Sequence, residues 1–298
     1  MVKSFSGIYA VLYALFDAQE RLDRNAMRRQ VLLCKQAGVQ GITVLGLATE
    51  VTKLTFEERC DVIRWASEDL QGELPLAVTI AGNSVAEQVA LIRIAEAASA
   101  DWLILQPPIT GSYPAAEYIE FFGRVAASTH LPAAIQNAPA YLGRGLTNED
   151  IVALNDKHPN IYLLKSEDNA AGMTDLVKKS NKRMTIFNGR GGLEMPAVLS
   201  AGAQGMILAP DMVDHAVRTY ALWKDGNITE ADANYQAALP SIEYVMRSIE
   251  HLLTYGKRLF GLRAGITIHD RAPCLRVAAA EMERLERLAE AAGPFKRQ

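Results

Sequence analysis

The chain of 298 residues has 49% hydrophobic residues, 22% charged residues and a net charge of −3. This is ordinary globular composition, with enough length for one large domain or two small ones. The sequence has no basic run of the kind that binds nucleic acid and no apolar run long enough to span a membrane. Cys34, Cys60 and Cys274 are scattered and lack metal-ligand spacing, so we expect neither disulfides nor a zinc site, and a cytoplasmic location.

The first segment, residues 1–16, places one lysine before a modest apolar stretch, as a signal peptide does. It lacks a small-residue cleavage site and continues into a charged stretch at residues 17–23. We therefore interpret it as a first strand.

Eight short apolar runs, each of strand length, follow one another along the chain. They lie at residues 7–15, 41–46, 74–82, 101–108, 131–139, 161–165, 184–189 and 205–210. Longer stretches between them, such as residues 24–38, 55–70 and 84–99, have apolar residues three and four apart, which predicts helices. Eight strand-helix repeats over this length predict a (β/α)8 barrel.

The remainder of the chain contains only helical patterns, from about residue 228 onward. No low-complexity linker or change of composition separates it from the repeats. The predicted fold class is therefore α/β, with a barrel domain at residues 1–225 and a helical C-terminal segment at 226–298.

Lys165 ends the apolar run at residues 161–165. In such barrels the reactive groups come from the carboxyl ends of the strands. A lysine in a desolvated pocket has its ammonium form disfavoured, so the free amine can attack a carbonyl and form an imine. The structural alternative is a lysine that pairs with Glu167 or Asp168, and position alone does not separate the two.

Four segments together carry a family resemblance. They are "VLGLATEVTKLTFEER", "QPPITGSYP", "IQNAPAYLGRGLT" and "LLKSED", which follow the second, fourth, fifth and sixth runs. With the C-terminal "GLRAGITIHDRAPCL", the sequence resembles the dihydrodipicolinate synthase and N-acetylneuraminate lyase family of class I aldolases over essentially its whole length. The resemblance implies a (β/α)8 barrel, a homotetramer, and chemistry on 2-keto acids through a lysine imine at Lys165, with no other cofactor.

The loop after the second run departs from the family pattern. The family usually has Gly-Thr-Thr-Gly-Glu or Gly-Ser-Thr-Gly-Glu, and this chain has Gly46-Leu47-Ala48-Thr49-Glu50. Two hydroxyl groups are missing, but the backbone amides of Ala48 and Thr49 can still bind a carboxylate. We interpret Glu50 as a structural acid.

The segment after the fifth run departs further. Where the family has a tyrosine that acts as general acid and base, this chain has Gln136, followed by Asn137 and Pro139. Glutamine forms hydrogen bonds but has no titratable proton. A standard synthase or sialic acid lyase mechanism is therefore not expected. The pocket resembles instead that of the 2-keto-3-deoxy-pentonate dehydratases of the L-arabinonate pathway.

The remaining candidate residues contact substrate in this interpretation. Gly189 and Arg190 lie in the glycine-rich turn after the seventh run, and Arg144 follows the fifth. Arginine can bind a carboxylate or phosphate through two hydrogen bonds, although a solvent-facing Arg190 is the simpler interpretation. Asn137 completes the substrate-binding set. The five histidines are isolated, and no metal is implied.

Two functional hypotheses follow. The first is a Schiff-base lyase, either a 2-keto-3-deoxy sugar acid dehydratase that uses Lys165 and Gln136 or a pyruvate-dependent aldolase of the same family. The second is a barrel that has lost catalysis and binds a keto acid. The expected partner is a small 2-keto acid, with no nucleic acid and no membrane.

Overall fold

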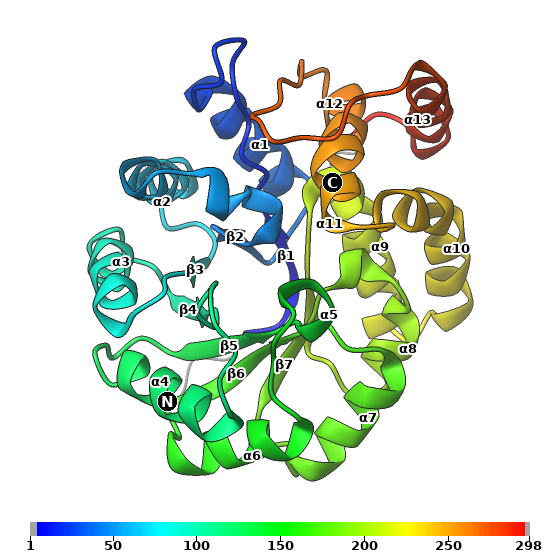
Figure 1. Ribbon diagram of the computed structural model, residues 1–298. Helices are drawn as coiled ribbons and strands as arrows, with labels where there is room; N and C mark the ends of the chain where they lie inside the picture. Colours follow the sequence, from blue (N-terminus) through cyan, green and yellow to red (C-terminus); the bar gives the residue numbers. More distant parts are fainter. Residues whose placement is uncertain (1–4, 296–298) are drawn as a thin grey trace.

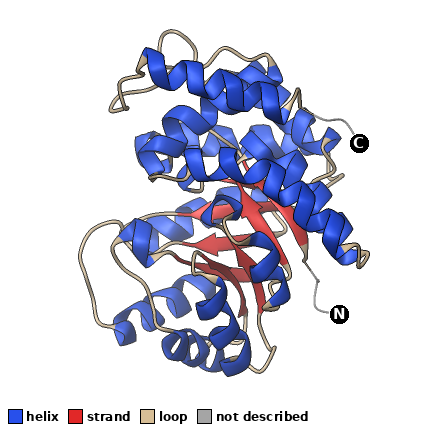
Figure 2. Ribbon diagram, turned by 90° about the vertical axis from the view of Figure 1, so that its right-hand side faces the viewer, coloured by secondary structure: helices blue, strands red, loops and turns tan. Residues whose placement is uncertain are grey.

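The computed structural model describes residues 5–295 of the protein. Within them, eight parallel strands form a closed barrel in chain order, and β1 pairs with both β2 and β8. Figures 1 and 2 show the strands inside a layer of helices. The strands are β1 (Gly7–Val11), β2 (Gly41–Val44), β3 (Leu76–Ile80), β4 (Trp102–Leu105), β5 (Ala133–Asn137), β6 (Ile161–Ser166), β7 (Thr185–Asn188) and β8 (Gly205–Leu208). The predicted (β/α)8 barrel is confirmed.

Helices connect each strand to the next, and α9 follows the last strand. They are α1 (Arg24–Gln36), α2 (Phe56–Leu70), α3 (Val85–Ala97), α4 (Ala115–Ala126), α5 (Pro139–Leu142), α6 (Asn148–Lys157), α7 (Ala170–Lys179), α8 (Met195–Ser200) and α9 (Val213–Lys224). Short 3-10 turns are η1 (Leu47–Thr49), η2 (Val51–Lys53), η3 (Arg190–Gly192) and η4 (Pro210–Met212).

Side-chain caps fix where several of these helices begin. Thr55 accepts a hydrogen bond from the Glu58 amide, and the Glu58 side chain accepts one from the Thr55 amide. Thr147 and Asp150 form the same reciprocal cap on α6. Each cap satisfies two amides that a helix start would otherwise leave unpaired. The loops after β2 and β5 therefore have defined ends.

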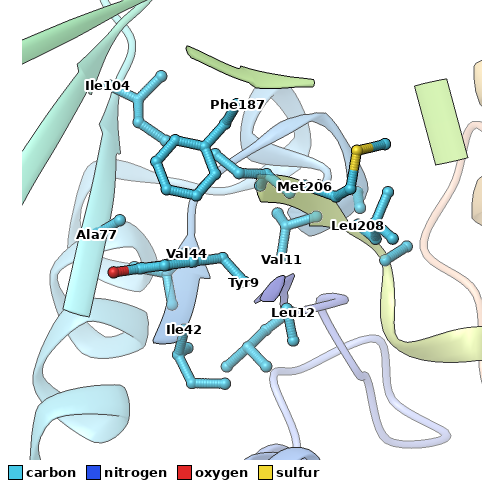
Figure 3. Close-up of a cluster of buried hydrophobic side chains, with 14 of the residues drawn as sticks. Tyr9, Val11, Leu12, Ile42, Val44, Ala77, Ile104, Phe187, Met206 and Leu208 are labelled. Atoms are coloured by element: carbon cyan, nitrogen blue, oxygen red, sulfur yellow. The ribbon is translucent and has the colours of Figure 1, made fainter. Parts of the chain in front are cut away.

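Aromatic side chains fill the interior of the barrel away from its carboxyl end. Tyr9 and Trp102 have ring centroids 5.5 Å apart, Tyr9 and Phe187 5.2 Å, and Trp102 and Phe187 5.5 Å. Figure 3 shows Tyr9 and Phe187 within the buried cluster. A Cβ atom on Gly41 would lie 2.1 Å from the Tyr9 ring, so glycine makes room for this packing. The barrel is a filled core and not a pore.

The inward-facing positions nearer the carboxyl end divide into two halves. Residues paired side by side in a parallel sheet share a face, and faces alternate along each strand. The registers of β2 to β6 therefore predict that one set of polar side chains faces the interior of the barrel: Thr43, Thr79, Gln106, Gln136 and Lys165. In β1 and β8 the residues that face the interior at this level are Val11 and Ile207. We name these the polar half and the apolar half of the mouth.

The C-terminal helices gather on one side of the barrel, drawn in gold to red in Figure 1. They are α10 (Ile228–Val245), α11 (Ile249–His251), the π-helical turn η5 (Leu252–Gly256), α12 (Lys257–Ala264) and α13 (Ala279–Ala292). Buried Arg263 of α12 binds both carboxylate oxygens of Asp214, at 3.0 and 2.7 Å. This pair joins α12 to the start of α9. Within residues 5–295 no helix combines the length and apolarity needed to cross a lipid bilayer.

Candidate active site

A cavity of about 40 Å³ lies at the carboxyl end of the barrel. Its wall combines the lysine, residues of the loops after β2, β5 and β7, and residues of the C-terminal segment. The lining residues are Val11, Leu47, Ala48, Tyr141, Lys165, Glu167, Arg190, Gly191, Ile207, Ala209, Met246, Ile249 and Leu252. The C-terminal segment therefore helps to enclose this cavity.

Lys165 lies in β6 with its side chain in the cavity wall. Its Nζ is 3.2 Å from Oε1 of Glu167, and both side chains are 5% exposed. The two groups form a buried ion pair, in which each is the charged partner of the other. The catalytic and the ion-pair interpretations of Lys165 are thus compatible, since the pair can exchange a proton directly.

Glu167 makes contacts with three neighbours. Besides Lys165, its Oε1 lies 3.5 Å from Nε2 of Gln136, and its Oε2 accepts a hydrogen bond from the Arg190 amide. A Cβ atom on Gly189 would lie 2.3 Å from Oε2, so glycine at 189 leaves room for the carboxylate. From the sequence, Glu167 was expected only as a charge partner of Lys165. Its spacing of two residues from Lys165 indicates a closer relation, because side chains two apart in an extended chain point to the same side.

Gln136 lies beside Lys165 in the register of β5 and β6. It is 2% exposed, and its Oε1 accepts a hydrogen bond of 2.8 Å from Nε2 of Gln106. A row of hydrogen-bonding groups therefore runs from Gln106 through Gln136 and Glu167 to Lys165. The sequence analysis assigned no role to Gln106.

The loop after β2 brings Leu47 and Ala48 to the cavity. Thr49 is fully buried. Its hydroxyl donates to the Leu12 carbonyl at 2.6 Å and its amide donates to the Gly46 carbonyl at 3.0 Å. The hydrogen bonds of Thr49 thus hold the loop in place, and Ala48 is the candidate of the two that lines the cavity.

Asn137 and Arg144 connect neighbouring loops. The Asn137 side chain accepts from the Leu146 amide at 2.8 Å and donates to the Leu146 carbonyl at 3.0 Å. Arg144 donates from Nη1 to the Pro108 carbonyl, which joins the loops after β5 and β4. Asn137 also lines a neighbouring pocket of about 290 Å³ with Glu167 and Asp168.

Arg190 and Tyr141 lie at the outer part of the cavity. Arg190 pairs with Glu194 at 2.5 Å and bonds to the Tyr141 hydroxyl. Burial raises the pKa of Tyr141, and the charge of Glu167 adds to this shift. Both side chains line the cavity together with Lys165.

Metal ligation is a separate question, which the positions of acidic, histidine and cysteine side chains address. Within residues 5–295, no group of three or more of these residues is arranged to hold a metal ion.

A buried lysine beside a carboxylate, at the carboxyl end of a (β/α)8 barrel, is the arrangement of a class I aldolase or lyase. Comparison with known proteins agrees. The chain belongs to the dihydrodipicolinate synthetase family, whose model matches residues 4–292. It is thus an enzyme of a family of lyases and aldolases.

Three comparisons illustrate the range of relatives. YagE of Escherichia coli K12, a proposed 2-dehydro-3-deoxy-D-gluconate aldolase, is 28% identical over 79% of this chain and 80% of its own. The 4-hydroxy-tetrahydrodipicolinate synthase of Persephonella marina is 27% identical over 70% of this chain and 72% of its own. The crystal structure of a dihydrodipicolinate synthetase homologue from Pseudomonas aeruginosa matches with a TM-score of 0.91, covering 97% of this chain and 100% of its own at 23% identity.

Proposed function

We propose that the protein dehydrates a 2-keto-3-deoxy sugar acid through an imine on Lys165, with Glu167 as the proton-transfer group. The observation that carries the proposal is the 3.2 Å contact between Lys165 and Glu167 in a buried cavity. Gln136 supports it, because a glutamine cannot carry the proton that a tyrosine carries in the family's aldol step.

The first step uses the ion pair directly. Glu167 takes a proton from Lys165, and the free amine attacks C2 of the keto acid. The former carbonyl oxygen takes one proton from the nitrogen and one back from Glu167 and leaves as water, which gives the iminium and restores the Glu167 carboxylate.

Elimination then needs one proton to leave C3 and a hydroxide to leave C4. The Glu167 carboxylate removes the C3 proton and the electrons delocalise into the iminium, which gives an enamine. The enamine expels the C4 hydroxyl, which leaves as water with the proton held by Glu167. Water then hydrolyses the unsaturated iminium and frees Lys165. The net change is loss of one water from the substrate, with no carbon–carbon bond broken.

The other candidate residues support binding in this proposal. The Ala48 segment contacts the substrate carboxylate, and Arg190 with Tyr141 binds the distal hydroxyl groups. Asn137, Arg144, Thr49 and Gly189 hold the loops and leave the space in which these groups act. We also propose a homotetramer, from the family resemblance, which sedimentation analysis tests.

Aldol cleavage of a similar sugar acid is the second candidate. It is favoured by the names of two relatives, YagE and the proposed 2-dehydro-3-deoxy-D-pentonate aldolase YjhH of Escherichia coli K12, the latter 26% identical over 88% of this chain. The same imine serves both reactions. They differ in whether water or an aldehyde is released.

Borohydride trapping tests the proposal. The protein is incubated with pyruvate, 2-keto-3-deoxy-pentonates or 2-keto-3-deoxy-hexonates and reduced, and the adduct is located by peptide mass spectrometry, with Lys165→Ala as control. An adduct on Lys165 together with a dehydrated product supports the dehydratase. Release of pyruvate instead supports the aldolase. Binding without an adduct at Lys165 would leave a keto-acid-binding barrel.

A further inference from the structure

A buried glutamine behind the site makes no contact through which it could act on substrate directly. Gln106 lies two residues beyond Ile104 of β4 and is 3% exposed. Its backbone amide donates to the Ile80 backbone carbonyl at 2.9 Å, and its backbone carbonyl accepts from Nε2 of Gln88 at 2.9 Å. The backbone at Gln106 is therefore fixed by neighbours on β3 and α3.

The charge of Glu167 determines how the amide groups in the row must be oriented. A carboxylate only accepts hydrogen bonds, so Gln136 has to present its NH2 group to Glu167. Its carbonyl oxygen then faces Gln106, which has to present its own NH2 group, as the 2.8 Å bond shows. Each orientation is a consequence of the previous one.

Without Gln106, no hydrogen bond to the Gln136 carbonyl oxygen would hold this orientation. The terminal torsion of a glutamine is broad and roughly two-fold, so the Gln136 amide can turn over. A turned amide would direct its oxygen at the Glu167 carboxylate, which is repulsive. It would also leave a buried NH2 group without its acceptor.

We propose that Gln106 is a positioning residue for the proton transfer, and that it acts by holding the NH2 group of Gln136 toward Glu167. The proposal rests on the proposed function, because it assumes that Glu167 transfers the proton. The other polar or charged groups around Glu167 are Lys165 on β6, Tyr141 on α5 and Arg190 on η3, with Asp168 next in the chain.

The test uses pyruvate, whose methyl group corresponds to C3. In D2O an imine and a nearby base exchange the methyl protons for deuterium, and proton NMR follows the rate without knowledge of the full substrate. Gln106→Met is expected to lower the exchange rate about tenfold, the effect of one buried hydrogen bond. Borohydride trapping of pyruvate on Lys165 should remain.

Gln106→Glu keeps the shape and changes the hydrogen bonding. A carboxylate at 106 accepts the Gln136 NH2 group, turns the amide over and adds a negative charge to the row. The acid limb of the exchange rate should therefore move to higher pH, because a second negative charge favours protonation of the first. This isosteric variant also serves if Gln106→Met fails to fold.

A double-mutant cycle identifies the route of the effect. If Gln106 acts through Gln136, then Gln106→Met should cost nothing further in a Gln136→Met background. Gln30→Met is the matched control, since this fully buried glutamine bonds to the Tyr13 backbone and to neither Gln106 nor Gln136. It should leave the exchange rate close to that of the wild type.

The possible results separate the two proposals. Additive effects in the cycle, or an equal loss of exchange rate in Gln30→Met, would overturn the role of Gln106. If the protein traps pyruvate and exchanges its protons but dehydrates no sugar acid, the proposed substrate is wrong. The role of Gln106 is then still decided by the exchange rates of its own variants. If the wild-type protein neither traps pyruvate nor exchanges its protons, both proposals fail.

Discussion

Glu167 is the residue on which the proposed chemistry depends most after Lys165. Replacing it by glutamine keeps the size of the side chain and removes its ability to accept a proton. We expect Glu167→Gln to lower turnover at least 100-fold, the usual effect of losing a general base. The yield of the pyruvate adduct on Lys165 should fall much less than the turnover rate. Steady-state kinetics and peptide mass spectrometry measure the two effects.

The neighbouring acid provides a control. Asp168 caps the Asn169 amide at 2.8 Å, so Asp168→Asn changes a nearby charge without touching the pair. Its turnover should stay close to that of the wild type. Unchanged turnover in Glu167→Gln would mean that another group moves the proton.

Gly189 constrains the position of the Glu167 carboxylate. The added Cβ of Gly189→Ala would lie 2.3 Å from Oε2 and displace the carboxylate. We expect a loss of turnover approaching that of Glu167→Gln.

The background variant shows whether this loss passes through Glu167. In Glu167→Ala, the change Gly189→Ala should cost no further turnover, because the carboxylate that it displaces is gone. A second, independent loss would indicate damage elsewhere in the turn, which thermal unfolding curves would reveal.

At the scale of single residues, the sequence identified Lys165 but not the hydrogen bonds of the residues around it. Lys165 stood at a strand end, and the family resemblance gave it a role. Which atoms of Thr49 were free could not be predicted, because the 3-10 turn uses its amide and its hydroxyl for internal hydrogen bonds. The direction of the Gln136 amide depends on Gln106, which follows β4, and on Glu167, which follows β6, and no local pattern specifies either contact.

At the scale of elements, a buried ion pair joins the loop after β2 to α12. Glu50 has a left-handed backbone, with φ of 54°, and its carboxylate binds Lys257 and Lys53. The side chains of Glu50 and Lys257 are each 1% exposed. This pair joins the loop that carries Ala48 to the helical segment that follows Leu252, and both residues line the cavity.

Removal of one partner should be costly. Glu50→Gln leaves the Lys257 ammonium with Asp270 at 3.8 Å as its remaining partner. We expect a loss of about 3 kcal/mol in the free energy of unfolding, measured by urea denaturation. Lys257→Met should cost a similar amount, and the double variant less than the sum of the two.

Lys53→Met is the matched control, because Lys53 binds the same carboxylate from a more accessible position, 16% exposed. A loss of less than about 1 kcal/mol is expected there. Equal losses for Lys53 and Lys257 would contradict a special role for the buried contact.

The strands and helices were predictable because each has its own period and its own cap. The C-terminal segment was predictable as helix, but its breaks were not. Ser248 accepts a hydrogen bond from the His251 amide and starts α11 anew, and a π-helical turn follows. These breaks bring Met246, Ile249 and Leu252 to the cavity. The periodicity of apolar residues predicts which face of a helix is buried, but not which part of the molecule that face contacts.

At the scale of the whole molecule, a hydrogen bond crosses the closure of the barrel. The Tyr13 hydroxyl, just after β1, donates to Asp211 in η4, just after β8, at 2.7 Å. Burial raises the pKa of Asp211 to about 6, from 3.8. The folded protein therefore holds this proton more tightly than the unfolded chain does.

The sign of the pH effect follows. The contribution of Asp211 to stability is complete below pH 3.8 and is lost as pH rises through about 6, a total of about 3 kcal/mol. Asp211→Asn removes this dependence. From about pH 5 to about pH 8, we expect the variant to gain about 1 kcal/mol relative to the wild type in urea denaturation. A difference that does not change with pH would contradict the prediction.

The two halves of the mouth have a stereochemical consequence. A keto acid bound as an imine has Glu167 on its polar side and Val11, Ile207 and Ala209, which cannot accept a proton, on its apolar side. The two hydrogens at C3 of a 2-keto-3-deoxy acid are diastereotopic, and only one faces the carboxylate. A substrate deuterated at that one position should lose its label, and its epimer should carry the label into the product.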